Sequence, residues 1–275
     1  MREPVESQDS SEVIFSGLGV WLLAFATVTA GAFDLMWRGF DSAHQPIQAF
    51  GDNIPGREVM AYITGVWMIA AGVAILWRRS AKAGAVALAL IYLVFTIFWL
   101  PRFYNAPHYL GFHISVLVGV FAGFGSQLIV VGAGALLYAS RSPRGVLWPR
   151  TILFARWVFG ICAIDFGLSH LTNIQANFVY VPKWMPLGSE FWVVVTGICF
   201  VLAGIAMLSG VLDVLAARLL ALMFLAFNAI ALPQFIFAQP RDHVPWGGYA
   251  YNLAAVAASW ILADALATRH LEREG

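Results

Sequence analysis

Long apolar stretches alternate with short polar ones along almost the whole chain. Eight of them are long enough to cross a membrane, at about 14–37, 58–77, 83–100, 109–138, 152–172, 190–210, 214–236 and 247–267. A helix needs about 20 mainly apolar residues to span the hydrocarbon core of a bilayer. The pattern therefore predicts eight transmembrane helices. The first is expected to be a retained helix and not a cleaved signal peptide, because the preceding segment MREPVESQDSSE is acidic where a signal peptide is basic.

The composition agrees with an all-α integral membrane protein. Apolar residues make up 60% of the 275 positions and charged residues only 11%, whereas soluble domains carry about 25% charge. The net charge of +1 comes without a basic cluster, so nucleic-acid binding is excluded. Cys162 and Cys199 lie inside apolar stretches without a CxxC spacing and are expected to pack in the interior.

The basic residues are distributed unequally between the two sides of the predicted bundle. Eleven of the 16 Lys and Arg residues fall on the side that holds both termini, and five fall on the other side. The positive-inside rule then places both termini in the cytoplasm and the loops 38–57, 101–108, 173–189 and 237–246 outside. The expected location is the plasma membrane of a bacterium.

The chain contains an internal repeat. Residues 58–104 and 190–236 align without a gap and share 16 identities in 47 positions, several times more than such a composition gives by chance. The prediction is two parallel four-helix-bundle repeats, since an even number of spans brings each copy into the membrane in the same direction. The expected boundaries are an N-terminal tail at 1–13, repeats at 14–138 and 152–268, a linker at 139–151 and a C-terminal tail at 269–275.

Two short motifs recur in the repeat. A Leu-Pro pair occurs at 100–101 and at 232–233, and it is expected to end the third helix of each copy at the outer surface. The residue that follows is Arg102 in one copy and Gln234 in the other, so the two outer ends differ chemically. The second motif, Thr-Gly-x6-Gly at 64–72 and 196–204, is expected to let helices pack closely.

Two acidic residues lie inside predicted helices, near the outer ends. Asp165 is about 10 Å deep, where a carboxylate exposed to lipid costs about 2.5–3.5 kcal/mol; it is therefore expected to face the interior and to have a partner. Asp34 has Arg38 as its nearest candidate, four residues further along the helix. His170 and Glu190 could form a group that handles protons or orients a ligand, or a hydrogen-bonded network at the helix ends.

Metal and haem sites are not predicted. Asp165, His170, Glu190 and His243 are residue types that bind divalent ions, but no HxxxH or CxxC spacing fixes two ligands on one helix face. No pair of histidines is clearly placed for axial ligation of haem.

The second half resembles the DoxX/DoxD-like membrane proteins. The similarity lies in RWVFGICAIDFGLSHL at 156–171 and VPKWMPLGSEFWVVVTGICFVLAGIAML at 181–208, with an Arg-opened first helix, a Pro-Trp-x-Pro loop and a Thr-Gly-rich second helix. The first half lacks the opening Arg and the loop Trp. The resemblance implies a small four-helix subunit linked to membrane oxidoreductases that pass electrons to quinone.

Three functions remain open from the sequence. The leading one is a membrane subunit of a quinone-linked oxidoreductase system, with an apolar pocket near the outer leaflet. The others are a binder or carrier of lipid-like molecules and a docking subunit of a larger complex.

Whether the chain itself is an enzyme is left open. Quinone is expected as substrate, and a partner protein is expected to hold the redox cofactor, because the chain has no flavin, iron–sulfur or haem motif. The candidate ligand-binding residues are Asp165, His170, Glu190 and Gln234, with Asp34, Glu58 and Arg102 in the first half.

Overall fold

The computed structural model describes residues 17–41, 44, 56–143, 145 and 147–274. All regular structure in these ranges is helical, and eight helices are long and apolar enough to cross a membrane. The all-α, membrane-spanning class predicted from the hydropathy pattern is therefore confirmed. The expected N-terminal tail at 1–13 lies outside the described residues.

The helices follow the predicted spans closely. They are α2 (Leu18–Trp37), α3 (Arg57–Leu76), α4 (Ala81–Trp99), α5 (Arg102–Leu110), α6 (Ile114–Ser140), α7 (Leu147–Thr172), α8 (Ile174–Asn177), the 3-10 turn η1 (Phe178–Tyr180), α9 (Gly188–Ser209), α10 (Asp213–Ala226), the π-helical turn η2 (Phe227–Ala231), α11 (Pro233–Ala238) and α12 (His243–Glu274). Helix α7 begins inside the expected linker 139–151, and α12 runs on through the expected tail from 269.

Helix α4 ends at Trp99, directly before Leu100-Pro101, so the predicted stop is confirmed in the first copy. In the second copy it was wrong, because the π turn η2 leads from α10 to Leu232, and Pro233 is the first residue of α11. Proline has no amide hydrogen to donate, and the chain continues past it in two different ways. After Pro101 the turn is tight, with the Tyr104 amide bonding to the carbonyl of Pro101, 3.2 Å away. Before Pro233 the turn is wide, since the Leu232 amide bonds to the Phe227 carbonyl five residues back at 3.0 Å. A π turn of this kind shifts the helix register by one residue.

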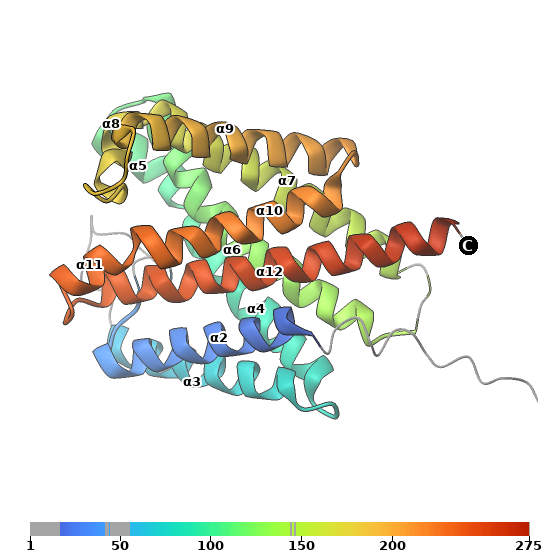
Figure 1. Ribbon diagram of the computed structural model, residues 1–275. Coiled ribbons are helices and arrows are strands. Elements are labelled where there is room, and N and C mark those ends of the chain that lie inside the picture. Colours follow the sequence, from blue (N-terminus) through green and yellow to red (C-terminus); the bar gives the residue numbers. More distant parts are fainter. Residues whose placement is uncertain (1–16, 42–43, 45–55, 144, 146, 275) are drawn as a thin grey trace, which may run out of the picture.

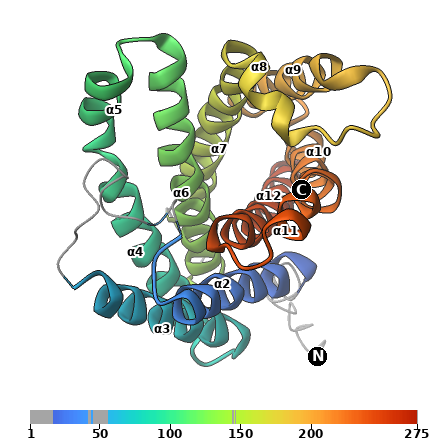
Figure 2. The ribbon, with the colours of Figure 1, turned by 90° about the vertical axis from the view of Figure 1, so that its left-hand side faces the viewer.

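The helices form a closed ring. Each long helix packs on the next in the order α2, α3, α4, α6, α7, α9, α10 and α12, and α12 returns to pack on α2. Helix α6 also contacts α12 across the ring, as the view along the helices in Figure 2 shows. The start of α2 and the end of α12 lie at one end of the molecule, and α5, α8 and α11 lie at the other (Figure 1). We call the second of these the α11 end.

Small residues bring neighbouring helices into backbone contact, as the Thr-Gly motif predicts. A Cβ atom on Gly31 of α2 would lie 2.5 Å from the carbonyl oxygen of Gly65 on α3. On α7, a Cβ atom on Gly167 would lie 2.6 Å from the carbonyl oxygen of Gly197 on α9. Only glycine allows these approaches, so the packing role of the motif is confirmed.

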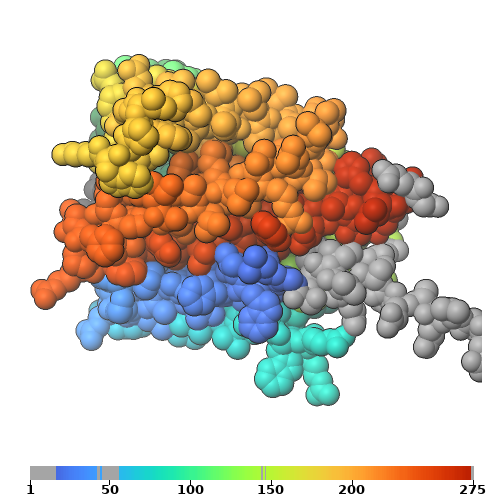
Figure 3. Space-filling view, in the orientation of Figure 1, coloured from blue at the N-terminus to red at the C-terminus, as the bar shows by residue number. Residues whose placement is uncertain are grey.

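The outward faces of the ring are apolar. Ile198, Leu202 and Ile205 follow one another at helical spacing along the exposed face of α9, and α10 exposes Leu215 and Leu219 in the same way. These helices cover much of the face seen in Figure 3. In water such a surface would be unstable, and lipid contact is the environment that suits it.

Candidate functional site

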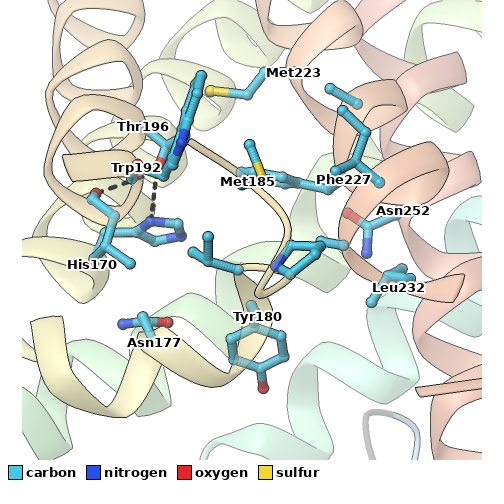
Figure 4. A pocket seen from close by; sticks show the side chains of 16 residues that line it. His170, Asn177, Tyr180, Met185, Trp192, Thr196, Met223, Phe227, Leu232 and Asn252 are labelled. Atoms are coloured by element: carbon cyan, nitrogen blue, oxygen red, sulfur yellow. Dashed lines mark hydrogen bonds between the residues drawn. The ribbon is translucent and has the colours of Figure 1, made fainter. Parts of the chain in front are cut away.

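A cavity of about 300 Å³ opens at the α11 end of the second half. Its walls come from α7, α9, α10 with η2, and α12, and the segment that contains η1 covers it. The lining includes three aromatic side chains, Tyr180, Trp192 and Phe227, and the thioethers of Met185 and Met223. Figure 4 shows His170 on one wall and Phe227 and Asn252 on the opposite wall.

His170 is the only titratable imidazole, carboxylate or amine among the residues that line this cavity. Its Nδ1 atom lies 3.1 Å from Oγ1 of Thr196. The ring packs edge-on against Phe200 at 5.4 Å and nearly parallel to Phe227 at 6.1 Å between centroids. Three residues, two on α9 and one on η2, thus hold the imidazole in one orientation, with its second nitrogen on the cavity side (Figure 4).

The π turn η2 shapes the opposite wall. Phe227, Ile230 and Ala231 of this turn line the cavity. The amide of the buried Asn228 donates a hydrogen bond to the carbonyl of Tyr249 on α12 at 3.2 Å, which ties the turn to the neighbouring helix. π turns inside α-helices are frequent at functional sites.

Gln234 supports the cover of the cavity without lining it. Its Nε2 lies 3.3 Å from the carbonyl oxygens of both Val179 and Tyr180, and 2.9 Å from that of Ala231. Trp192 fixes the other end of the cover, because its indole N–H donates to the carbonyl of Pro186 at 2.7 Å. The cover is therefore anchored to α9 and α11 on either side of the cavity.

Asp165 is interior, as expected, but it does not line the cavity. It lies one turn beyond Cys162, whose thiol contacts the Gly125 carbonyl of α6 at 3.5 Å. This puts Asp165 on the side of α7 that faces α6. Its buried Oδ2 has no hydrogen-bond partner in the described part of the chain, so the expected partner is not found there.

Glu190 and Glu58 occupy the first turns of α9 and α3, and both are exposed. The expected pairing of His170 with Glu190 is not formed, since His170 bonds to Thr196 instead. Arg102 is buried, with 2% of its surface exposed, and its guanidinium lies 3.7 Å from the ring centroid of Trp99. Glu190, Glu58 and Arg102 do not line the cavity.

Asp34 belongs to a separate buried cluster between α2 and α12. Its Oδ1 accepts a hydrogen bond from the Asp41 amide at 3.2 Å and lies 3.5 Å from Nε2 of His243. Trp37 stacks on the His243 ring, with centroids 5.1 Å apart and planes 3° apart. The expected ion pair with Arg38 was wrong, because Arg38 adopts a left-handed conformation (φ 52°) that ends α2 before the helical spacing can be used.

His44 completes this region of the first half. Its ring stacks on Phe95 of α4, with centroids 4.2 Å apart and planes 14° apart, and meets Tyr92 edge-on. Only 3% of its surface is exposed. Burial disfavours the charged imidazolium and lowers the pKa of His44 to about 3.

The sequence pattern missed most of the cavity wall. Thr196 was assigned to packing, while Phe227 and Asn252 carried no signal because apolar helices contain many such residues. The recurrence of the Thr-Gly pair in both halves was the one sequence feature that could have identified Thr196. At the opposite end, Asp213 was also missed; it lies 2.9 Å from His270 and 3.7 Å from Arg156.

No family model matches the chain, and no curated protein or solved structure is similar to it at a significant level.

Proposed function

We propose that the chain is the membrane subunit of a quinone-linked oxidoreductase system and that the cavity at the α11 end holds the quinone ring. The observation that carries this proposal is an apolar, aromatic- and thioether-lined cavity into which a single imidazole projects. Small-ligand pockets typically measure about 300–1,000 Å³ and combine apolar walls with a few polar groups. The resemblance of the second half to DoxX-like proteins supports the same reading.

The chemistry of a quinol suits this arrangement. Its oxidation to the quinone releases two protons and two electrons. His170 is placed to accept one proton, and imidazole is the side chain whose charge changes most readily near neutral pH. The two electrons pass to a cofactor held by a partner protein, and the second proton passes to solvent. Quinone reduction, the direction that the resemblance implies, runs these steps in reverse. The excess of basic residues on the opposite side supports an α11 end that faces away from the cytoplasm; in this orientation the proton leaves at the outer face.

We also propose that the two halves are copies of one four-helix unit, inserted in the same direction. Equivalent helix contacts support this. Gly31 meets Gly65 on the next helix, and Gly167 meets Gly197 in the same way. The first members of these pairs differ by 136 positions and the second members by 132, the shift of the gapless alignment.

The contacts of the fourth long helix of each half, α6 and α12, also support the proposed repeat. A Cβ atom on Gly19 of α2 would lie 3.4 Å from the Ala257 oxygen of α12. In the other half, a Cβ atom on Gly132 of α6 would lie 3.8 Å from the Ala155 side chain of α7. The fourth helix of each unit therefore packs on the first helix of the other unit. By these shifts Asp34 corresponds to His170, and Phe95 corresponds to Phe227.

Blocking the cavity tests the proposed function. Ala226 lines the cavity, so Ala226→Phe should fill it, whereas Ala83→Phe places the same ring on the exposed face of α4. Both variants and the wild type are extracted from native membranes in lipid nanodiscs, and the bound quinone is identified and quantified by mass spectrometry. Quinol oxidation by the same membranes is measured in parallel. We expect bound quinone and quinol oxidation to fall together in Ala226→Phe and to stay unchanged in Ala83→Phe.

The other outcomes select the other functions. If the wild type retains a lipid other than quinone and Ala226→Phe loses it, the chain is a lipid binder or carrier. If Ala226→Phe changes neither the bound molecules nor the activity of the assembly, the chain acts as a docking subunit. Either result contradicts the quinone proposal.

A further inference from the structure

The hydrogen bonds of Thr196 determine which nitrogen of His170 carries the proton. Oγ1 of Thr196 lies 2.7 Å from the carbonyl oxygen of Trp192, one turn earlier on α9. Two oxygens this close need a proton between them, so the Thr196 hydroxyl donates to that carbonyl. Its oxygen can then only accept from His170, and Nδ1 of His170 must be the donor in the 3.1 Å contact.

The other ring nitrogen is therefore an acceptor. In a neutral imidazole, a protonated Nδ1 leaves Nε2 with a free lone pair. Figure 4 shows this nitrogen on the cavity side of the ring. The cavity thus presents the Nε2 lone pair to whatever occupies it, beside the side-chain amides of Asn177 and Asn252.

The walls favour a flat ring. Trp192 and Phe227 supply aromatic surfaces, and Met185 and Met223 supply thioethers, which make favourable contacts with aromatic edges. The first half provides an internal comparison. There His44 lies flat on Phe95, the counterpart of Phe227, at 4.2 Å between centroids. The corresponding place in the first unit is thus filled by a planar ring from the chain itself.

We infer that the cavity selects the reduced, hydroxyl-bearing form of an aromatic ligand, a quinol or a phenol, whose hydroxyl group donates a hydrogen bond to Nε2 of His170. This inference rests on the proposed function and adds the redox form of the ligand to it. A quinone offers only carbonyl oxygens, which are acceptors and would face the Nε2 lone pair without a proton between them. A hydroxyl group supplies that proton.

Three probes of matched shape test this preference without requiring electron transfer. They are para-nonylphenol, para-nonylanisole, in which a methyl group replaces the hydroxyl hydrogen, and nonyl-benzoquinone. Binding to the purified full chain in nanodiscs is measured by equilibrium dialysis, and empty nanodiscs correct for partition into lipid. The proteins compared are the wild type, His170→Phe, which keeps a ring against Phe227 but removes the acceptor, and Thr196→Val, which removes the hydroxyl that accepts from Nδ1–H. The backbone hydrogen bond between His170 and Val193 remains in Thr196→Val. Thermal unfolding of each variant verifies folding.

The wild type should bind the phenol about five- to tenfold more tightly than the anisole or the quinone, the ratio that one net hydrogen bond produces. The ratio should fall to about one in His170→Phe. In Thr196→Val it should also fall, because the imidazole loses one of its two hydrogen-bond partners and can move its proton to Nε2 more readily. Thr196→Val leaves the cavity-facing nitrogen in place, so it keeps the test decisive if His170→Phe does not fold.

The failures are distinguishable. If the three probes bind the wild type equally, the cavity takes rings as proposed but the inference about the hydroxyl group is wrong. The inference is also overturned if the preference for phenol persists in both variants. If none of the probes binds above empty nanodiscs, the proposed function itself fails.

Discussion

The distance between α7 and α9 is the structural quantity on which the geometry of His170 depends, and Gly167→Ala should change it. The new Cβ atom would lie 2.6 Å from both the carbonyl oxygen of Gly197 and the Cγ2 atom of Val201. Ordinary contact begins at 3.4 Å, so the two helices must separate by about 0.8 Å at this point. The obstacle is partly backbone and cannot rotate away.

The separation also weakens the hydrogen bond beside it. If α9 moves as a body, the distance from His170 Nδ1 to Thr196 Oγ1 grows from 3.1 Å to as much as about 3.9 Å, beyond hydrogen-bonding range. Overpacking costs about 1–3 kcal/mol and the lost bond about 1 kcal/mol, while replacing glycine by alanine in a helix returns up to about 1 kcal/mol. The net loss is about 2 kcal/mol, or roughly 4–8 °C in Tm.

The matched control is Gly119→Ala, the same substitution on α6 at a position where no atom lies within 4 Å of the new Cβ. It should leave Tm unchanged or raise it by a few degrees, because only the helix-propensity gain remains. Tm is measured in nanodiscs by intrinsic fluorescence, and phenol affinity is measured on the same samples. The reasoning is refuted if Gly167→Ala unfolds at or above the wild-type temperature, or if it binds phenol with unchanged affinity and selectivity.

Two further predictions concern buried ionisable groups. The pKa of His44 is lowered to about 3, below the usual value of 6.5, so the unfolded chain binds the extra proton between these values. The stability that His44 contributes is complete above pH 6.5 and is lost as pH falls toward 3, by up to about 1.4 kcal/mol per unit. His44→Phe should flatten the fall of Tm between pH 6.5 and 5, and an unchanged slope would contradict this. Asp213→Asn leaves Arg156 without its carboxylate and should cost about 3 kcal/mol, whereas the exposed Glu190→Gln should change the free energy of unfolding by less than about 0.5 kcal/mol; Tm values that differ by less than 2 °C between these two would refute the buried-pair argument.

The spans could be predicted from the sequence because lipid imposes a simple rule. Each crossing must satisfy its own backbone hydrogen bonds within about 20 apolar residues, so hydropathy alone locates α3 (Arg57–Leu76) and α9 (Gly188–Ser209) to within two residues of the predicted spans. The Thr-Gly motif was readable for the same reason, since close helix approach in lipid needs small residues.

The candidate site was only partly predictable, because its geometry depends on contacts that are distant in sequence. His170 was identified as a polar residue near a helix end, but its partner Thr196 lies 26 residues away on another helix. Asp34 contacts His243, which lies 209 positions further along the chain on the last helix. No sequence periodicity connects positions so far apart. Glu190 looked equivalent to His170 by depth, yet it faces outward because rotation about the helix axis, and not depth alone, decides which side chains meet.

In the proposed repeat, the two units differ in the connection between the first helix and the second. The shifts of 136 and 132 positions mean that this connection is four residues longer in the first unit than in the second. In the first unit, the connection brings His44 onto Phe95. In the second, the shorter connection forms α8 and η1, which cover the cavity beside Phe227 without filling it.

This difference explains why the corresponding positions hold different side chains. A carboxylate at the place of His170 would need a donor from the protein, and Asp34 obtains one from the Asp41 amide in the longer connection. The second oxygen of Asp34, Oδ2, has no hydrogen-bond partner among the described residues. His170 bonds to Thr196 through Nδ1, and its other nitrogen, on the cavity side (Figure 4), is left for water or a ligand.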